Sequence, residues 1–586
     1  MKSISTVLSL CFVLGCLLQA SSQPNVIIIL TDDQGYGDLS IHGNPILETP
    51  HLDALHGESV RFTDFHSAPV CTPSRGQLLT GRDAMRNGAW SWAFGHEMIH
   101  GSNKTMADVF RENGYRTGHF GKWHLGDNYP YRPGDKGFDE TISHGGAATH
   151  QTPDYWQNDN FDDYFRHKDG SYRKHEGYVT DVWFDLSIDF MSRCQKAEQP
   201  FFLYLPTNAP HSPHYIDDTY VEPYLGTGKA AKFFGMIANL DENIGRLDAF
   251  LKESGLSENT ILIFMSDNGA TAGYGIFNAE MRGKKMGYYE GGHRVPCFIR
   301  WPNGKFGDPR DIGELTQMQD IFPTLIDFCD LKTDTETLLK FDGTSLAALL
   351  TGTLEKLPSR KLVVQWSPLD YPDYGHAAVL WGNWRLVHDK ELYNIARDPA
   401  QKDDIGYLYP EIVSSMQSHY ADWWETVKPV VSIYSRIGIG GAENPSRLSC
   451  FEWTKKTNTK VNVTGQSKSV MPGKKVNGSW MLDVVKAGTY RIELLRYPKE
   501  ADFPMAAAYP ETKREYRTFP ECKALPIARA RLKIGTFDGT VAVAKSDKAA
   551  EFEVELPEGE VEMRTWLLDA SGEELCGAYY AEVERL

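Results

Sequence analysis

Between residue 24 and about residue 350, short apolar runs alternate with stretches of helical periodicity. The runs cover residues 26–30, 60–65, 117–120, 201–205 and 261–265, and residues 232–252 place apolar side chains at helical spacing. Strands that are apolar throughout are buried on both faces, which is typical of a parallel sheet between two layers of helices. Residues 23–355 are therefore predicted to form an α/β domain with a mostly parallel sheet sandwiched by helices.

The remainder of the chain changes character twice. Residues 356–431 carry a few strand-like runs and a last amphipathic stretch that includes Tyr420 and Trp424, which predicts a small α+β subdomain. Glycines and polar residues mark a boundary after residue 431, and strict alternation follows, as in Tyr490, Ile492 and Leu494. This alternation predicts an all-β, antiparallel accessory module over residues 432–586.

The first 22 residues have the pattern of an export signal. A lysine at position 2 precedes an apolar run from Val7 to Leu18 and then small and polar residues, so we expect cleavage near Gln23 and a periplasmic or secreted protein. The alternative is a lipoprotein, because Val13 to Cys16 loosely resembles a lipidation site. No later segment approaches the roughly 20 apolar residues of a membrane span, so none is expected.

Charge excludes one broad class of function. The chain has 61 basic and 78 acidic residues and a formal net charge of −17, which argues against a nucleic-acid-binding surface. An anionic substrate would require a local positive pocket.

Acidic side chains follow two of the apolar runs at the point where each strand should end. Asp32 and Asp33 follow the first run, and Asp267 and Asn268 follow the last. Ligands of open parallel sheets bind beyond the carboxyl ends of the strands, so these groups should meet at one edge. Three carboxylates need a cation; all-oxygen ligands favour a hard ion, and a flexible cage built from side chains favours Ca²⁺ over the stricter Mg²⁺. Either pair alone would more simply cap a helix or turn.

Cations and histidines follow other runs at the same predicted edge. Lys122 and His124 come after the third run, His211 after the fourth, and Lys285 lies in a glycine-containing stretch further on. Each would singly be read as a surface or capping group. Together with calcium they predict a positive cup suited to a tetrahedral oxyanion.

Cys71 lies in the loop that follows the second run, where a helix should begin. Backbone N–H groups and the helix dipole favour an anion at such a position. The residue pattern leaves two possibilities open, a thiolate nucleophile of low pKa or an inert core residue.

The residues around Cys71 resemble the signature of the type I sulfatases, a formylglycine-dependent family within the alkaline-phosphatase-like superfamily. The match consists of Cys71, Pro73, Ser74 and Arg75, followed by Gly81 and Arg82. Residues 25–38, 121–126, 266–269 and 290–296 also resemble family motifs, in the family's order. The resemblance extends over about residues 24 to 430. The chain as a whole resembles bacterial arylsulfatases and carbohydrate sulfatases that carry a β-rich tail.

The resemblance implies an enzyme that hydrolyses sulfate monoesters, with sulfated carbohydrates as the expected substrates. A maturation enzyme would read Pro73 and Arg75 and oxidise Cys71 to formylglycine (3-oxoalanine), whose hydrate is the nucleophile. One Ca²⁺ would be bound by Asp32, Asp33, Asp267, Asn268 and the modified Cys71. By the same resemblance, Arg75 would hold the hydrate, and Lys122 and Lys285 would stabilise the sulfate. His211 would protonate the leaving alcohol, and His124 would remove the second hydrate proton.

Aromatic and histidine side chains in the loops after strands are expected to line the substrate mouth, with simple loop packing as the equal alternative. These residues are Trp90, Trp92, His96 and the stretch from His144 to Trp156, with His144 and Trp156 singled out. Two other functions remain open: hydrolysis of phosphonates or phosphodiesters on the same core, and a non-catalytic glycan-binding protein with a decayed site.

Overall fold

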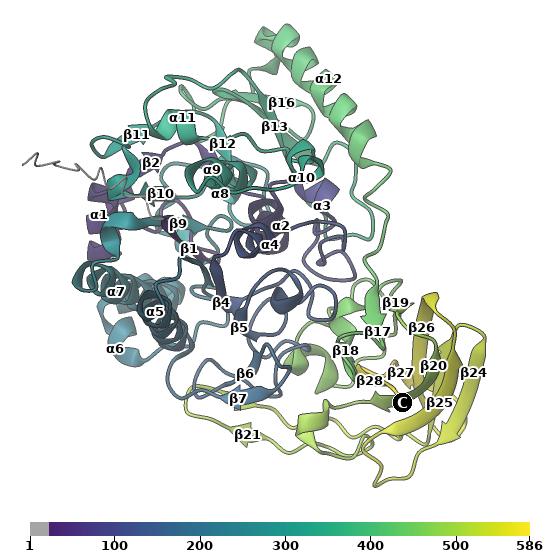
Figure 1. The fold of residues 1–586 in the computed structure, drawn as a ribbon. Helices are drawn as coiled ribbons and strands as arrows, with labels where there is room; N and C mark the ends of the chain where they lie inside the picture. The colour runs from purple at the N-terminus through teal and green to yellow at the C-terminus, as the bar shows by residue number, and fades with distance from the viewer. Residues whose placement is uncertain (1–22) are drawn as a thin grey trace, which may run out of the picture.

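The computed structural model describes residues 23–586, so the predicted signal sequence and Cys16 lie outside the described residues. Within this range the apolar runs form the centre of a ten-stranded sheet (Figure 1). Its strands, in spatial order, are β11 (Arg310–Ile312), β2 (Val60–Phe62), β10 (Cys297–Arg300), β9 (Thr260–Ser266), β1 (Asn25–Thr31), β8 (Phe201–Pro206), β4 (Arg116–Lys122), β5 (Glu140–His144), β6 (Tyr164–His167) and β7 (Tyr172–Lys174).

The middle of this sheet is parallel, as predicted. β9, β1, β8, β4 and β5 all run in one direction, whereas β10, β6 and β7 pair antiparallel to their neighbours. The predicted strand over residues 60–65 divides into β2 and a separate β3 (Phe65–His66), which pairs with β12 (Thr316–Gln317). The division falls at Thr63 and Asp64, where the Asp64 carboxylate bonds to His66 and Arg385.

Helices cover both faces of the sheet because successive strand residues point to opposite sides. In β1, Val26, Ile28 and Leu30 face one core, and Ile27 and Ile29 face the other. The first core packs against α2 (Cys71–Thr80), α4 (Met106–Glu112), α9 (Ile321–Phe328) and α11 (Ala347–Leu350). The second packs against α1 (Pro50–Gly57), α5 (Val179–Lys196) and α7 (Ala231–Glu253), which confirms the helix predicted over residues 232–252.

A smaller α+β unit follows the large sheet. Four antiparallel strands lie in the order β13 (Lys361–Gln365), β14 (Ala377–Trp381), β15 (Trp384–Val387) and β16 (Glu391–Asn394). The long helix α12 (Pro410–Val427) packs on them through a core that contains Tyr420 and Trp424. The other short helices of the chain are α3 (Ala84–Asn87), α6 (Asp218–Val221), α8 (Glu290–His293) and α10 (Thr335–Leu339).

Residues after 432 form β-sheets, as predicted. One sheet contains β17 (Ile437–Ile439), β19 (Ser479–Val484), β26 (Gly559–Leu568), β23 (Arg529–Ile534), β24 (Phe537–Ala542) and β27 (Glu574–Cys576). A second contains β18 (Ser446–Ser449), β28 (Tyr580–Arg585), β20 (Gly488–Leu495) and β25 (Ala550–Leu556), and β21 (Thr512–Lys513) pairs with β22 (Thr518–Phe519). The module is not wholly antiparallel, because β17 and β19 are parallel.

The β-sheet module shares its hydrophobic core with the large domain. Phe94, Met98, Tyr131 and Trp156 pack in the same buried cluster as the module's own strands. Figure 1 shows the module lying beside the ends of β5 and β6. The β-sheet module is therefore packed against the large domain through an apolar core that both parts share.

Two further observations concern the surface and the thiols. In residues 23–586, no helix is both long and apolar enough to pass through a membrane. The seven cysteines of this range are all free and buried.

Candidate active site

The ends of β1 and β9 bring the predicted acidic residues together. The two strands are parallel neighbours, and Thr31 pairs with Ser266 directly before Asp32 and Asp267. The backbone N–H of Asp33 donates to Asp267 Oδ1 at 3.2 Å, and Asn268 Nδ2 donates to Asp33 Oδ1 at 2.8 Å. Residues far apart in the sequence thus share one buried site.

Glycine 269 lets another segment approach this site closely. A Cβ atom at Gly269 would lie 1.9 Å from the carbonyl oxygen of Gly291, so only glycine fits there. The backbone N–H of Gly269 donates to the carbonyl of Gly292 at 3.0 Å. This contact fixes the turn after β9 against α8.

Cys71 faces the same acidic residues from the first position of α2, as the helix prediction placed it. One ligand atom each from Asp32, Cys71 and Asp267 lies within 4.8 Å of the others. Arg75, one turn further along α2, donates to Asp267 Oδ2 at 3.1 and 2.8 Å and to the Lys122 carbonyl at 3.1 Å. Arg75 is completely buried, so these bonds set its position.

Two lysines neutralise part of the negative charge. Lys122, at the end of β4, places its Nζ 2.6 Å from Asp32 Oδ2. Lys285 Nζ lies 2.5 Å from Asp33 Oδ1 and 3.8 Å from Cys71 Sγ. Burial opposes ionisation of Asp33, but the nearby Lys285 and His211 hold its pKa below the ordinary value.

The remaining oxygens suit a hard metal ion. Among the described residues, Asp32 Oδ1 and Asn268 Oδ1 are buried and have no hydrogen-bond partner. Burial, then the neighbouring Asp32, raise the pKa of Asp267 to about 6, against the opposing effect of Arg75 and Lys122. Carboxylate and amide oxygens with unused lone pairs are the ligands that Ca²⁺ prefers. The residues therefore fit the predicted metal group.

The thiol of Cys71 is not a ready nucleophile in this environment. Burial raises its pKa above the ordinary value, and the nearby Asp32 and Asp267 add to this, against the opposing effect of Lys122 and Lys285. A thiolate of low pKa, one of the two possibilities that the sequence left open, is therefore disfavoured.

Two histidines have their tautomers fixed by backbone contacts. His124 Nε2 lies 2.9 Å from the Trp92 carbonyl and so carries the proton, which leaves Nδ1 as a base without a partner among the described residues. His211 Nδ1 lies 2.6 Å from the Ser212 carbonyl, and its Nε2 lies 3.8 Å from Asp33 Oδ2. Burial lowers the pKa of His211 to about 3.

These groups open into a cavity of about 510 Å³. Cys71, His124, His211 and Lys285 line it, and so does Trp92, one of the residues expected at the substrate mouth. The volume lies in the range of small-molecule sites. The site therefore combines reactive groups with room for a ligand.

Four other residues expected at the mouth lie outside this cavity. Trp90 is buried, donates from Nε1 to the Val431 carbonyl at 3.1 Å and stacks on His96. His144 lines a separate cavity of about 150 Å³, and Trp156 packs its ring against aromatic rings of the β-sheet module. These four side chains are buried and do not line the cavity, whereas Trp92 does, as do His150 and Gln151 from the stretch between His144 and Trp156.

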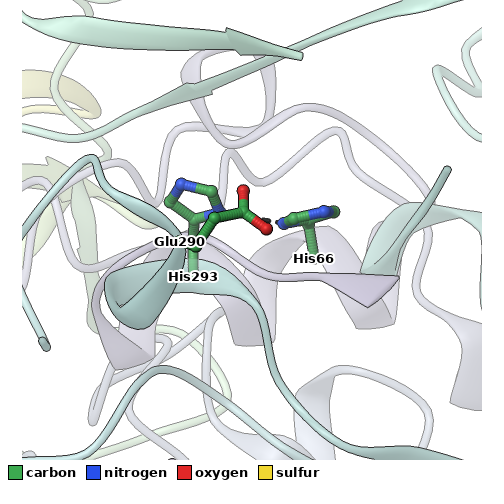
Figure 2. Close-up of side chains that lie close together, drawn as sticks. All are labelled: His66, Glu290 and His293. Carbon is green, nitrogen blue, oxygen red and sulfur yellow. Dashed lines mark hydrogen bonds between the residues drawn. The ribbon is translucent and has the colours of Figure 1, made fainter. Parts of the chain in front are cut away.

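Three side chains to which the sequence analysis gave no role form a second buried cluster, and two of them lie in the motif at residues 290–296. Figure 2 shows His66, Glu290 and His293 close together, with the two histidine Nδ1 atoms 2.9 Å apart. Arg385 donates to Glu290 Oε1 and to Asp64 Oδ1, at 2.7 Å each. One guanidinium thus compensates two buried carboxylates and ties β15 to α8, so the cluster has a structural role.

Several cavity residues escaped the sequence analysis. They come from loops of the large domain and from the β-sheet module: Tyr215, Trp366, Asn462, Thr464, Ser467, Lys468 and Arg517. His150 and Gln151, which also line the cavity, lie in the stretch from His144 to Trp156 that was expected at the mouth. None follows a predicted strand of the large sheet or belongs to a recognised motif. Lys468 and Arg517 stand in polar stretches with no periodic pattern, so no sequence signal marks them.

Comparison with known proteins agrees with this arrangement. A family model described as Sulfatase matches residues 24–331. N-acetylgalactosamine-6-sulfatase of Canis lupus familiaris is 32% identical over 363 residues, covering 58% of this chain and 68% of that protein. The uncharacterized sulfatase YdeN of Escherichia coli (strain K12) is 28% identical over 495 residues, covering 70% and 87%. The crystal structure of Ps i-CgsB in complex with k-i-k-neocarrahexaose has 26% identity and a TM-score of 0.63, covering 71% of this chain and 95% of that one. The chain belongs to the sulfatase family, the enzymes that hydrolyse sulfuric esters.

Proposed function

We propose that this sulfatase is an exported enzyme that hydrolyses sulfate monoesters of saccharides to an alcohol and inorganic sulfate, using Ca²⁺ and a formylglycine derived from Cys71. The observation that carries the proposal is the position of Cys71, between the acidic cluster and Lys285 at a ligand-sized cavity. Saccharide substrates are supported by the names of the relatives, one an N-acetylgalactosamine-6-sulfatase and one a complex with k-i-k-neocarrahexaose.

The nucleophile is proposed to arise by oxidation of Cys71 by a separate maturation enzyme that reads Pro73 and Arg75. Formylglycine supplies a hydrate hydroxyl for attack on sulfur and a second hydroxyl through which the aldehyde re-forms and sulfate leaves. Arg75, fixed on Asp267, holds this position, and Asp267 accepts the nucleophile's proton.

The sulfate group would lie among fixed positive charges. Lys122 and Lys285 are held by Asp32 and Asp33 and stabilise charge that develops on the sulfate oxygens. Asp32, Asp33, Asp267 and Asn268, together with the modified residue at position 71, would hold Ca²⁺. When bound, the ion supplies further positive charge for the sulfate oxygens.

His211 is proposed to protonate the leaving alcohol. Its Nδ1 is fixed by the Ser212 carbonyl, so Nε2 is the nitrogen available to the substrate. In the enzyme without substrate, His211 has a low pKa and is neutral. It gains a proton when an anionic substrate lies beside it, because an adjacent negative charge favours the imidazolium. A sugar alkoxide is a poor leaving group and depends on this proton.

His124 is proposed to accept the second hydrate proton. The Trp92 carbonyl holds its Nε2–H, and burial, followed by the charge of Lys122, keeps its pKa well below the ordinary value. His124 therefore stays neutral, with Nδ1 free to act as a base.

The experiment that tests this function is a desulfation assay over defined sulfated saccharides, with released inorganic sulfate as the readout. Phosphate monoesters and diesters, assayed with and without calcium, test the alternative of phosphoester hydrolysis on the same core. A sulfatase turns over sulfate esters far faster than either phosphate class. Faster phosphate turnover would replace the proposal by that alternative.

Export is proposed from residues 1–22. The mass and N-terminal sequence of the protein recovered from its native host provide the test. Cleavage near Gln23 supports a periplasmic or secreted enzyme, whereas a mature chain that begins at a lipidated Cys16 supports the membrane-tethered alternative.

A further inference from the structure

One wall of the catalytic cavity comes from the β-sheet module. Residues 462–468 and Arg517 line it together with Cys71 and His211. Lys468 lies in a short π-helix, Gln466–Val470, and Arg517 directly precedes β22. All these module residues lie beyond residues 24–331, the part of the chain that matches the sulfatase family.

Hydrogen bonds hold this wall in place without any ligand. Gln466 Nε2 donates to the carbonyls of Gln151 at 2.9 Å and Asp154 at 3.2 Å. The backbone N–H of Thr152 donates to the Thr464 carbonyl at 2.8 Å. Because these bonds involve backbone groups of both the large domain and the β-sheet module, this wall of the cavity is already in place before a ligand binds.

The wall carries two cations that lack a carboxylate partner. Within residues 23–586, neither Lys468 nor Arg517 has an acidic oxygen within the 4.0 Å of an ion pair, in contrast to Lys122 and Lys285. Arg517 Nη2 donates to Ser467 Oγ at 2.7 Å. Its Nη1 is buried and has no hydrogen-bond partner in the described part of the chain. Arg517 as a whole is half-buried, and a guanidinium donor without a partner is unfavourable unless a ligand or water satisfies it.

The surroundings direct this charge toward the cavity. The guanidinium of Arg517 lies over the Phe519 ring at 4.2 Å, which covers one of its faces. His150 lines the same cavity, and after burial the charges of Arg517, Lys468 and His211 contribute to its low pKa. The charges of Lys468, Arg517 and His211 thus all act at His150, in the cavity that also contains Cys71. This part of the cavity is locally positive although the net charge of the chain is −17.

We propose that Lys468 and Arg517 bind a second anionic group of the substrate, a sulfate ester or a carboxylate on the sugar next to the one that loses sulfate. The inference rests on the proposed saccharide sulfatase function and adds a specificity to it. Arg517 offers the fork geometry that suits either anion, and Lys468 adds a mobile point charge. The preferred substrates are therefore saccharides with at least two anionic groups.

The test compares four substrates built on the best-cleaved monosulfated sugar. They are that sugar alone and the same sugar linked to a neutral, a sulfated or a uronic-acid unit. Wild type should prefer the sulfated or the uronic-acid compound over the neutral one by roughly tenfold or more in kcat/KM. The compound that is preferred identifies the second anion as sulfate or carboxylate.

Variants assign this preference to the two cations. Arg517→Gln and Lys468→Gln should raise KM for the preferred compound roughly tenfold, leave its kcat nearly unchanged and raise KM for the single sugar much less. Lys460→Gln removes an exposed charge of the same module outside the cavity and should change neither. Circular dichroism and thermal unfolding confirm that each variant is folded.

Specific outcomes overturn the inference. Equal rates on neutral and anionic compounds by the wild type exclude a second anion subsite, even though the sulfatase function stands. Equal losses on single and extended sugars in both variants would instead indicate a general role in folding or catalysis. If the wild type released sulfate from no compound at all, the proposed function would fail, and the inference with it.

Discussion

Arg75 donates two hydrogen bonds to Asp267 Oδ2 and so joins the helix that begins at Cys71 to the end of β9. The guanidinium and the carboxylate are both completely buried. The proposed nucleophile and a proposed metal ligand are thereby fixed relative to each other, as precise catalysis requires.

The first prediction concerns Cys71. We expect the peptide that contains Cys71, isolated from the native host, to have the lower mass of formylglycine, and Cys71→Ala to lose about 10³-fold or more in kcat. Mass spectrometry and saccharide desulfation check the two parts. Cys194→Ala, which alters another buried thiol, should retain activity. An unmodified thiol in a fully active enzyme would contradict the mechanism.

The second prediction concerns calcium. Because Asp32, Asp33 and Asp267 repel one another, bound Ca²⁺ should stabilise the fold, by about 2.7 kcal/mol at a free concentration 100 times Kd. Chelation should therefore lower the midpoint of thermal unfolding and abolish turnover. Asp33→Ala should remove the calcium-dependent shift. An unfolding midpoint that is the same with and without calcium would exclude a structural contribution of the ion.

The third prediction concerns His211 and the leaving group. His211→Ala should lower kcat on sugar sulfates by roughly 10²-fold or more and on activated aryl sulfates much less, because a phenolate leaves without a proton. Parallel assays on both substrate types measure the difference. His376→Ala, at an exposed histidine, is the control. Equal losses on both substrates would show that His211 is not the acid.

The fourth prediction concerns the cluster in Figure 2 and its partner Arg385. Arg385→Met removes the guanidinium shared by the buried Asp64 and Glu290, leaves them only His66 and the more distant Arg294, and should cost about 3 kcal/mol in the free energy of unfolding. Arg173→Met, at an exposed ion pair with Asp169, should cost about 1 kcal/mol or less. Denaturant titration measures both.

The same variant should change how stability depends on pH. Burial opposes ionisation of Glu290, but Arg385 and the two histidines lower its pKa from 4.5 to about 2. A carboxylate with a depressed folded-state pKa stabilises the protein above its unfolded pKa and loses that effect as pH falls. The stability difference between wild type and Arg385→Met should therefore shrink between pH 4.5 and about 2. A constant difference would contradict the assigned ion pairs.

The sequence by itself determined the parallel sheet and the residues at its edge. Apolar runs specify buried strands, and their parallel order places whatever follows them at one edge, so Asp32, Lys122 and Asp267 could be brought together from periodicity. The division of residues 60–65 into β2 and β3 could not be foreseen, because it depends on Asp64 meeting Arg385 from a distant strand.

Only the tertiary structure decided which side chains line the cavity at Cys71. Trp90, His96, His144 and Trp156 have the composition of a sugar-binding mouth, yet packing turns them away from the cavity. Lys468 and Arg517 enter it because the β-sheet module shares a core with the large domain. Strand periodicity encodes contacts within a sheet, whereas the approach of one module to another depends on complementary surfaces that no local pattern records.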